Sequence, residues 1–164
     1  MTMDQGRAPA PEGSPWRWPA AAAALTIAAA HVPITHEHLS EAPYIGWSFV
    51  ALEIVAVVLA VALIAQDTRT VWRAAVAVPA LAIAAYLMTR SVALPQIRDD
   101  QGNWTEPLSF VALTAEVLLL VIAAAHRNRS WRGSQVVARP VLLFGVLLVV
   151  GLVATSCAAR AGTE

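Results

Sequence analysis

Three histidines and two glutamates lie close together in residues 31–41, HVPITHEHLSE. Neutral imidazole and carboxylate groups are common ligands of zinc, copper and iron. In a helix, residues two apart point roughly 200° away from each other, so a histidine pair with this spacing needs an extended loop to share a metal. We therefore expect a loop here, with a transition-metal site (copper or zinc) whose ligands are His31, His36, His38 and Glu41. The alternative is that His36 and His38 are ordinary solvated loop residues and that His31 caps or hydrogen-bonds near the end of the first helix.

A second group of ionisable residues interrupts apolar segments. Glu53 lies about 15 Å and Glu116 about 13.5 Å beyond the start of their expected helices, at about 1.5 Å per residue. A carboxylate at this depth in a membrane costs roughly 2.5 kcal/mol or more, so it needs a partner or a proton. We expect Arg90 to contact Glu116 or Glu53, with Tyr86 one turn away on the same face as Arg90. Such a cluster either carries a proton or only fixes which helices pack together.

The composition places both groups in a membrane. Hydrophobic residues make up 58% of the 164-residue chain and charged residues only 13%, which is too apolar for an ordinary soluble domain. A helix needs about 17 to 25 apolar residues to cross the hydrocarbon layer. The segments that meet or nearly meet this requirement are 16–33, 43–65, 71–94, 107–125 and 140–158. The sequence therefore predicts an all-α, polytopic transmembrane helical bundle with five transmembrane helices.

These segments divide the chain into five parts. They are a disordered cytoplasmic tail at 1–15, a four-helix transmembrane core at 16–126, a cytoplasmic loop at 127–139, a fifth transmembrane helix at 140–158 and a short tail at 159–164. The first tail is rich in proline, glycine and charge, which is typical of disorder. Gly151 and Thr155 form a pair of small residues on the fifth helix, typical of a packing or dimer face. Beside the lipid bilayer, a homo-oligomer or a larger membrane complex is therefore a possible partner.

The arginines predict the orientation of the chain. All 11 basic residues are arginine, and alanine and valine dominate the apolar positions, which is typical of a GC-rich bacterial genome. The positive-inside rule then predicts a multi-pass protein of the cell membrane with a cytoplasmic N-terminus and an external C-terminus. In this orientation Arg90, Arg98 and Arg160 lie outside. The arginines on the cytoplasmic side are Arg7, Arg17, Arg69, Arg73, Arg127, Arg129, Arg132 and Arg139.

A short internal repeat links the two halves of the core. The sequence SFVALE at 48–53 recurs as SFVALTAE at 109–116, each time in a helix that a proline opens after an acidic loop. The pattern predicts a parallel repeat of two helical hairpins. Glu53 and Glu116 would then lie at similar depth on opposite sides of one bundle axis.

Other classes of function have no support in the sequence. The net charge of zero gives no electrostatic footprint for nucleic acid. No Walker loop, dinucleotide-binding turn, GxSxG elbow or HExxH helix occurs, so we do not expect an enzyme.

Two runs carry a resemblance to known proteins, HLSEAPYIGWSFVALE at 38–53 and RSVALPQIRDDQGNWTEPLSFVALTAE at 90–116. They resemble an uncharacterised group of small multi-pass integral membrane proteins from GC-rich bacteria. The resemblance covers the four core helices and leaves out the N-terminal tail and the fifth helix. Because that group has no assigned activity, the resemblance implies the membrane class and no functional residues.

The sequence thus predicts a non-enzymatic membrane protein that binds or conducts a cation, either a transition metal or a proton. The site would comprise Glu53, Arg90 and Glu116 below a rim of histidines and acids. The alternative is a non-catalytic accessory or assembly subunit of a larger membrane complex, in which the buried charges are purely structural. A third hypothesis, a membrane-embedded enzyme, has only His31, His38 and Glu41 around a metal in its favour.

Overall fold

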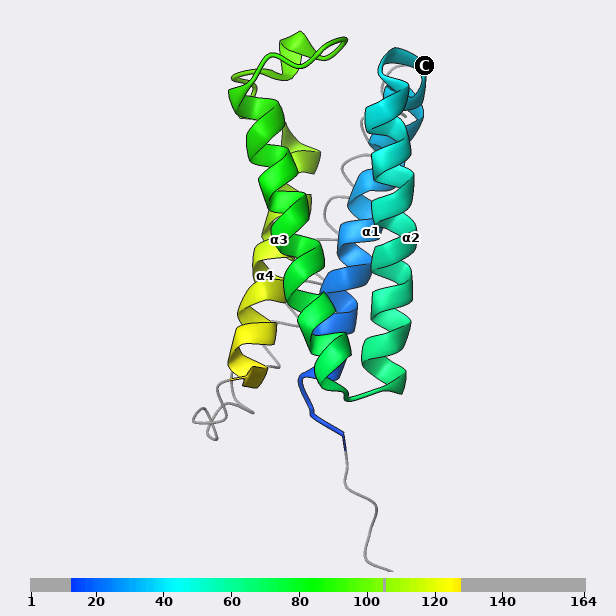
Figure 1. The fold of residues 1–164 in the computed structure, drawn as a ribbon, viewed down its shortest axis with the longest axis vertical. Coiled ribbons are helices and arrows are strands. Elements are labelled where there is room, and N and C mark those ends of the chain that lie inside the picture. Colours follow the sequence, from blue (N-terminus) through cyan, green and yellow to red (C-terminus); the bar gives the residue numbers. More distant parts are fainter. Residues whose placement is uncertain (1–12, 105, 128–164) are drawn as a thin grey trace, which may run out of the picture.

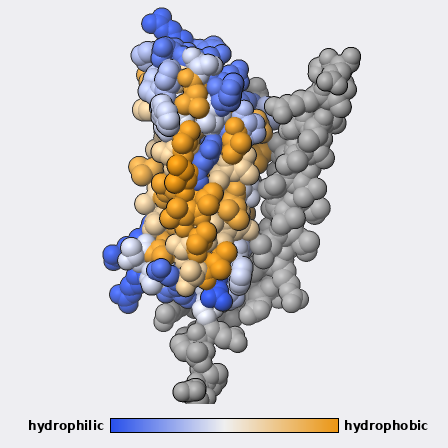
Figure 2. Space-filling view, turned by 90° about the vertical axis from the view of Figure 1, so that its right-hand side faces the viewer, coloured by the Kyte–Doolittle hydropathy of each residue, from blue (hydrophilic) through white to orange (hydrophobic). Residues whose placement is uncertain are grey.

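The computed structural model describes residues 13–104 and 106–127. The elements of this part are α1 (Arg17–Glu41), α2 (Pro43–Ala65), α3 (Arg69–Ser91), the short 3₁₀ helix η1 (Arg98–Asp100) and α4 (Pro107–Arg127). Each of the four α-helices is long and apolar enough to cross a membrane. Figure 2 shows a hydrophobic band between two hydrophilic ends on one face of the molecule. The prediction of an all-helical, multi-pass membrane protein is confirmed here, whereas the predicted fifth helix at 140–158 lies outside the described residues.

Proline and threonine set the starts of the later helices. Pro43 and Pro107 are the first residues of α2 and α4, where the missing N–H costs nothing because first-turn N–H groups have no partner within the helix. Thr68 precedes α3, and its hydroxyl accepts a hydrogen bond from the N–H of Val71 at 3.4 Å. The α2 helix has the bounds that the sequence predicts.

The first helix is longer than predicted. We expected it to end at Pro33 and to be followed by a loop, but α1 continues to Glu41, and only Ala42 separates it from α2. The side chains of Thr35 and His38 form 3.0 Å hydrogen bonds with backbone carbonyls one turn earlier. These local bonds and packing against α2 support the last turns of the helix beyond the proline.

The four helices form a ring in which α1 contacts α2 and α4, and α3 also contacts α2 and α4. Small residues dominate the buried face of α1, where they let the neighbouring helices approach closely. Figure 1 shows α2 and α3 close together at the end that holds their 66–68 connection. Toward the opposite end, which carries residues 92–106, α3 and α4 diverge from α1 and α2.

Gly46 lies in the first turn of α2, just after the one-residue connection to α1, and it packs closely against α1. A Cβ atom at this position would lie 2.6 Å from the backbone N and Cα of Leu39. We expect Gly46→Ala to push the two helices apart and to lower the free energy of unfolding by about 1–3 kcal/mol. Thermal unfolding in detergent measures this, with Ala77→Val at an exposed position of α3 as the control. A midpoint that Gly46→Ala leaves unchanged would contradict this prediction.

A polar cluster joins three segments at the end where α2 meets α3. The Asp67 carboxylate accepts hydrogen bonds from the backbone N–H of Ser14 at 2.7 Å and from Nε1 of Trp72 at 2.6 Å. The His126 ring stacks on the Trp72 indole with centroids 3.7 Å apart, and its Nε2 lies 3.9 Å from Asp67 Oδ1. Ser14, which the sequence placed in the N-terminal tail, is therefore connected to the 66–68 connection and, through a 3.1 Å contact of its hydroxyl with His126 Nδ1, to α4.

The pKa of Asp67 is lowered from its ordinary value of 3.8. Burial, the largest single influence, raises this pKa, but the hydrogen bonds from Ser14 and Trp72 and the charges of His126 and Arg17 together outweigh it. Because the pKa is lower in the folded state, the ionised carboxylate stabilises the fold above the ordinary value. This stabilisation is lost as the pH falls through the lower, folded-state pKa.

We therefore expect Asp67→Asn to lower the thermal midpoint at neutral pH, and its difference from the wild type to shrink below about pH 4. Thermal scans in detergent over a series of pH values measure this difference. Asp99→Asn is the control because Asp99 is exposed; it should match the wild type at every pH. A wild-type advantage that stays constant into the acid range would show that ionised Asp67 does not support the fold.

Candidate functional site

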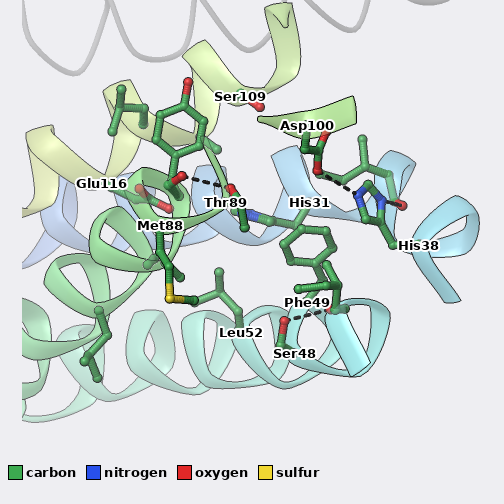
Figure 3. A pocket seen from close by; sticks show the side chains of 18 of the residues that line it. His31, His38, Ser48, Phe49, Leu52, Met88, Thr89, Asp100, Ser109 and Glu116 are labelled. Carbon is green, nitrogen blue, oxygen red and sulfur yellow. Dashed lines mark hydrogen bonds and ion pairs between the residues drawn. The ribbon is translucent and has the colours of Figure 1, made fainter. Parts of the chain in front are cut away.

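A pocket of about 550 Å³ separates α2 from α3, with α1 and α4 behind it (Figure 3). Its volume lies within the range of about 300–1,000 Å³ that is typical of small-molecule sites. Residues of α2 between 44 and 55 form one wall, and residues of α3 between 78 and 90 form the other. Most of these side chains are apolar, including Leu52 and Met88.

The pocket opens sideways, between α2 and α3. Several wall residues are also exposed on the surface of the bundle: Leu81 is 72%, Met88 50% and Tyr44 47% exposed. Within residues 13–104 and 106–127, no helix covers this opening. The opening lies along helices of membrane-spanning length.

Glu116 is the buried acid of the pocket. It lines the pocket from α4, it is only 2% exposed, and it forms no hydrogen bond or ion pair with any other residue that the structure describes. Figure 3 shows it in the same part of the pocket as Met88 and Thr89 of α3. A lone carboxylate away from water is costly, so this group holds either a proton or a cation.

Arg90 lies at one end of the pocket, which we call the capped end. Its guanidinium lies 2.7 Å from Asp100 Oδ1 and 2.8 Å from Glu106 Oε2. It also donates to Ser109 Oγ at 3.1 Å and lies over the Tyr86 ring, 5.2 Å from the centroid. These contacts tie the end of α3 to η1 and to the start of α4.

Two further contacts hold the capped end together. The Tyr44 hydroxyl of α2 donates to the backbone carbonyl of Pro95 at 2.6 Å. His38 Nε2 of α1 lies 3.9 Å from Asp100 Oδ2. The 92–106 segment is thus attached to the α1–α2 hairpin on the far side of the pocket, and polar side chains line this end of the pocket.

The predicted contact of Arg90 with Glu116 or Glu53 is not formed. We expected α3 to extend to residue 94, but it ends at Ser91, so Arg90 lies beside the acids of the 92–106 segment. Glu116 lies about 13.5 Å further along α4 from its first residue, beyond these nearer partners. Tyr86 does lie on the same face as Arg90, as predicted.

Glu53 has a different environment from Glu116. It accepts a hydrogen bond from the Thr35 hydroxyl at 2.5 Å and thereby links α2 to α1. The matched serines of the short repeat also differ, because Ser48 donates to the backbone of Ile45 whereas Ser109 donates to the Glu106 carboxylate. The two hairpins therefore use their repeated polar residues in different ways.

The four residues predicted as metal ligands do not form a metal site. His31, His36, His38 and Glu41 all belong to the helix α1, and His36 and Glu41 are exposed. His31 and His38 lie on one face, each with its ring centroid 5.1 Å from that of Phe49, and each hydrogen-bonds through Nδ1 to a carbonyl one turn earlier. His36 points away from the face of His31 and His38, and these two residues are two helical turns apart, about 10.5 Å along the axis, so the three rings do not converge. In the described part of the chain, no three His, Cys, Asp or Glu residues are grouped as metal ligands.

Several residues of the site were missed at the level of sequence. Asp100 and Glu106 were placed in an acidic loop but were not paired with Arg90, although that loop directly follows the helix that carries Arg90. Ser109 follows Glu106 by three residues at a helix start, a spacing that brings both side chains to one face. No sequence pattern indicated that Thr35 would bond to Glu53 or that Phe49 would pack against the two histidines.

Comparisons of the chain with protein-family models, with curated proteins and with solved structures found no match. The resemblance to uncharacterised membrane proteins therefore stays a prediction, and the function is argued below from the site alone.

Proposed function

We propose that this chain is a non-enzymatic protein of the cell membrane that binds and releases a proton or another cation at Glu116. One observation carries the proposal: a carboxyl group that is 2% exposed lines a pocket of about 550 Å³ and has no partner among the described residues. In such surroundings the negative charge must be neutralised. A proton or a cation that enters the pocket can do this.

Two other ionisable side chains in the described helices, the buried Arg90 and the partly buried Glu53, support this assignment by contrast. Arg90 is paired with two carboxylates, and Glu53 accepts a hydrogen bond from Thr35. These groups connect helices, which is the usual role of a buried charge or polar group that serves structure. Glu116 connects nothing in the described part of the chain and faces the pocket instead.

The paired charges also favour the alternative, an accessory or assembly subunit of a larger membrane complex. In that case a basic group of a partner helix would enter through the opening between α2 and α3 and neutralise Glu116. The labelling experiment below tests the first hypothesis, whereas co-purification of a stoichiometric partner protein would favour the second.

We further propose the arrangement of the protein in the membrane from the arginine distribution. The N-terminus is cytoplasmic, the capped end faces outward, and 140–158 forms a fifth transmembrane helix that places the C-terminus outside. We also propose that the protein is bacterial and that its two helical hairpins are related as a parallel repeat.

Dicyclohexylcarbodiimide tests the proposal, because this lipid-soluble reagent couples to protonated carboxyl groups. We expect mass spectrometry of the full chain in lipid vesicles to show one added reagent, located at Glu116 by peptide mapping. Glu116→Gln should remove this label, whereas the controls Glu53→Gln and Glu37→Gln should retain it. Absence of label at Glu116 in the wild type would overturn the proposal.

A further inference from the structure

On the basis of the proposed function, we infer that the ligand that exchanges with the proton at Glu116 is an amphiphilic organic cation. This class of molecule has an apolar body and a single positive charge. It would enter the pocket from the lipid, through the opening between α2 and α3.

The size and lining of the pocket indicate an apolar body. About 550 Å³ is far more space than a proton or a dehydrated metal ion fills, and it matches a small organic molecule. Hard metal ions require several oxygen ligands, often six or more. Around Glu116 the neighbours on the pocket walls are mostly alkyl groups, such as Leu52, Met88 and Leu113. These side chains would pack favourably against the apolar body of a ligand.

The charges around the pocket indicate a positive ligand. The Arg90 guanidinium is neutralised by two carboxylates at 2.7 and 2.8 Å. An anionic ligand would therefore find no uncompensated positive charge there, whereas a cation finds Glu116. The Phe49 ring also lines the pocket, and aromatic rings favour cations. The ionisable groups that line the pocket are His31, His38, Tyr44, Tyr86, Arg90, Asp100, Glu106 and Glu116.

The two possible routes into the pocket differ in polarity. At the capped end, the contacts of Arg90, His38 and Tyr44 with the 92–106 segment make the lining polar and charged. The sideways opening is framed by exposed apolar residues, among them Leu81 and Met88. A molecule that partitions into lipid reaches this opening directly, whereas a hydrated inorganic ion does not.

Tetraphenylphosphonium and tetraphenylborate test the inference, since they are hydrophobic ions of nearly equal size and opposite charge. Binding to the full chain in lipid nanodiscs is measured by equilibrium dialysis at several pH values. We expect tetraphenylphosphonium to bind more tightly as Glu116 loses its proton, by up to about tenfold per pH unit. Tetraphenylborate should show no binding that depends on Glu116.

Variants separate the charge from the shape of the pocket. Glu116→Gln should weaken tetraphenylphosphonium binding by at least about tenfold and remove its pH dependence, as expected when a charged partner is lost. Glu53→Gln is the matched control and should bind as the wild type does. Ala82→Phe fills the pocket from the wall of α3 without changing an ionisable group, so it should also weaken binding.

The outcomes distinguish this inference from the proposed function. If the carbodiimide labels Glu116 but tetraphenylphosphonium neither binds nor slows the labelling, the ligand class is wrong and the proton site stands. If Glu116 takes no label and the phosphonium does not bind, both proposals fail. Equal binding of the two ions, or equal phosphonium binding by the wild type and Glu116→Gln, would also overturn the inference.

Discussion

Replacing Glu116 with leucine is expected to stabilise the protein and at the same time to abolish carbodiimide labelling. Glu116 is buried without a partner among the described residues, so leucine removes an unsatisfied polar group and adds contacts with the apolar pocket wall. We expect the free energy of unfolding in detergent to rise by about 1–2 kcal/mol. Thermal unfolding of both proteins in the same detergent measures the change.

The matched control for this prediction is Glu53→Leu. Glu53 accepts the 2.5 Å hydrogen bond from Thr35, so its replacement removes this link between α2 and α1 and should destabilise the protein by about 1 kcal/mol, while the Thr35 hydroxyl can still donate to the His31 carbonyl at 3.0 Å. If Glu116→Leu were destabilising to the same extent as Glu53→Leu, Glu116 would be a structural residue. The accessory-subunit alternative would then explain the buried acids better than a proton site.

Replacing Arg90 with methionine should lower the free energy of unfolding, by more than Glu116→Leu raises it. The side chain is 5% exposed and holds Asp100, Glu106 and Ser109 together at the capped end. Its loss leaves two neighbouring carboxylates without their cation. Breaking a buried pair typically costs about 3–5 kcal/mol, and since both carboxylates are partly exposed we expect a loss of about 3 kcal/mol. Thermal unfolding in detergent measures this loss.

Two further variants show whether the loss comes from the ion pairs. Arg98→Met changes an exposed arginine in η1 and should have little effect. Adding Glu106→Gln to Arg90→Met removes one of the orphaned charges, so the double variant should recover part of the lost stability. Equal stability of Arg90→Met and the wild type would mean that the cluster does not hold α3 to α4.

The sequence predicted the membrane-spanning helices well because long apolar runs with proline at the start leave few alternatives. The α2 helix begins at Pro43 and ends at Ala65, as predicted. The prediction was wrong where Pro33 was taken as the end of the first helix. The polar residues that follow it remain helical because hydrogen bonds from Thr35 and His38 to earlier carbonyls support the last turns. This one error produced both the predicted loop and the predicted metal site.

The polar cluster was only partly predictable. The sequence singled out Glu116 and Arg90, because ionisable residues in apolar runs are rare, but it could not say which side chains meet. The partners of Arg90 depend on where α3 ends. Because α3 ends three residues earlier than expected, Arg90 pairs with Asp100 and Glu106 and not with Glu53 or Glu116. The pocket itself arises from the divergence of α2 and α3, which no local pattern encodes.

Infrared difference spectroscopy tests most directly whether Glu116 exchanges a proton inside the bundle. Spectra of the full chain in lipid bilayers are recorded through a stepwise change of pH, for the wild type and for Glu116→Gln. We predict a carboxylic-acid C=O band in the wild type that disappears as the group ionises and that is missing from the Glu116→Gln spectra at every pH. If the same pH-dependent bands occurred in both proteins, Glu116 would hold no exchangeable proton.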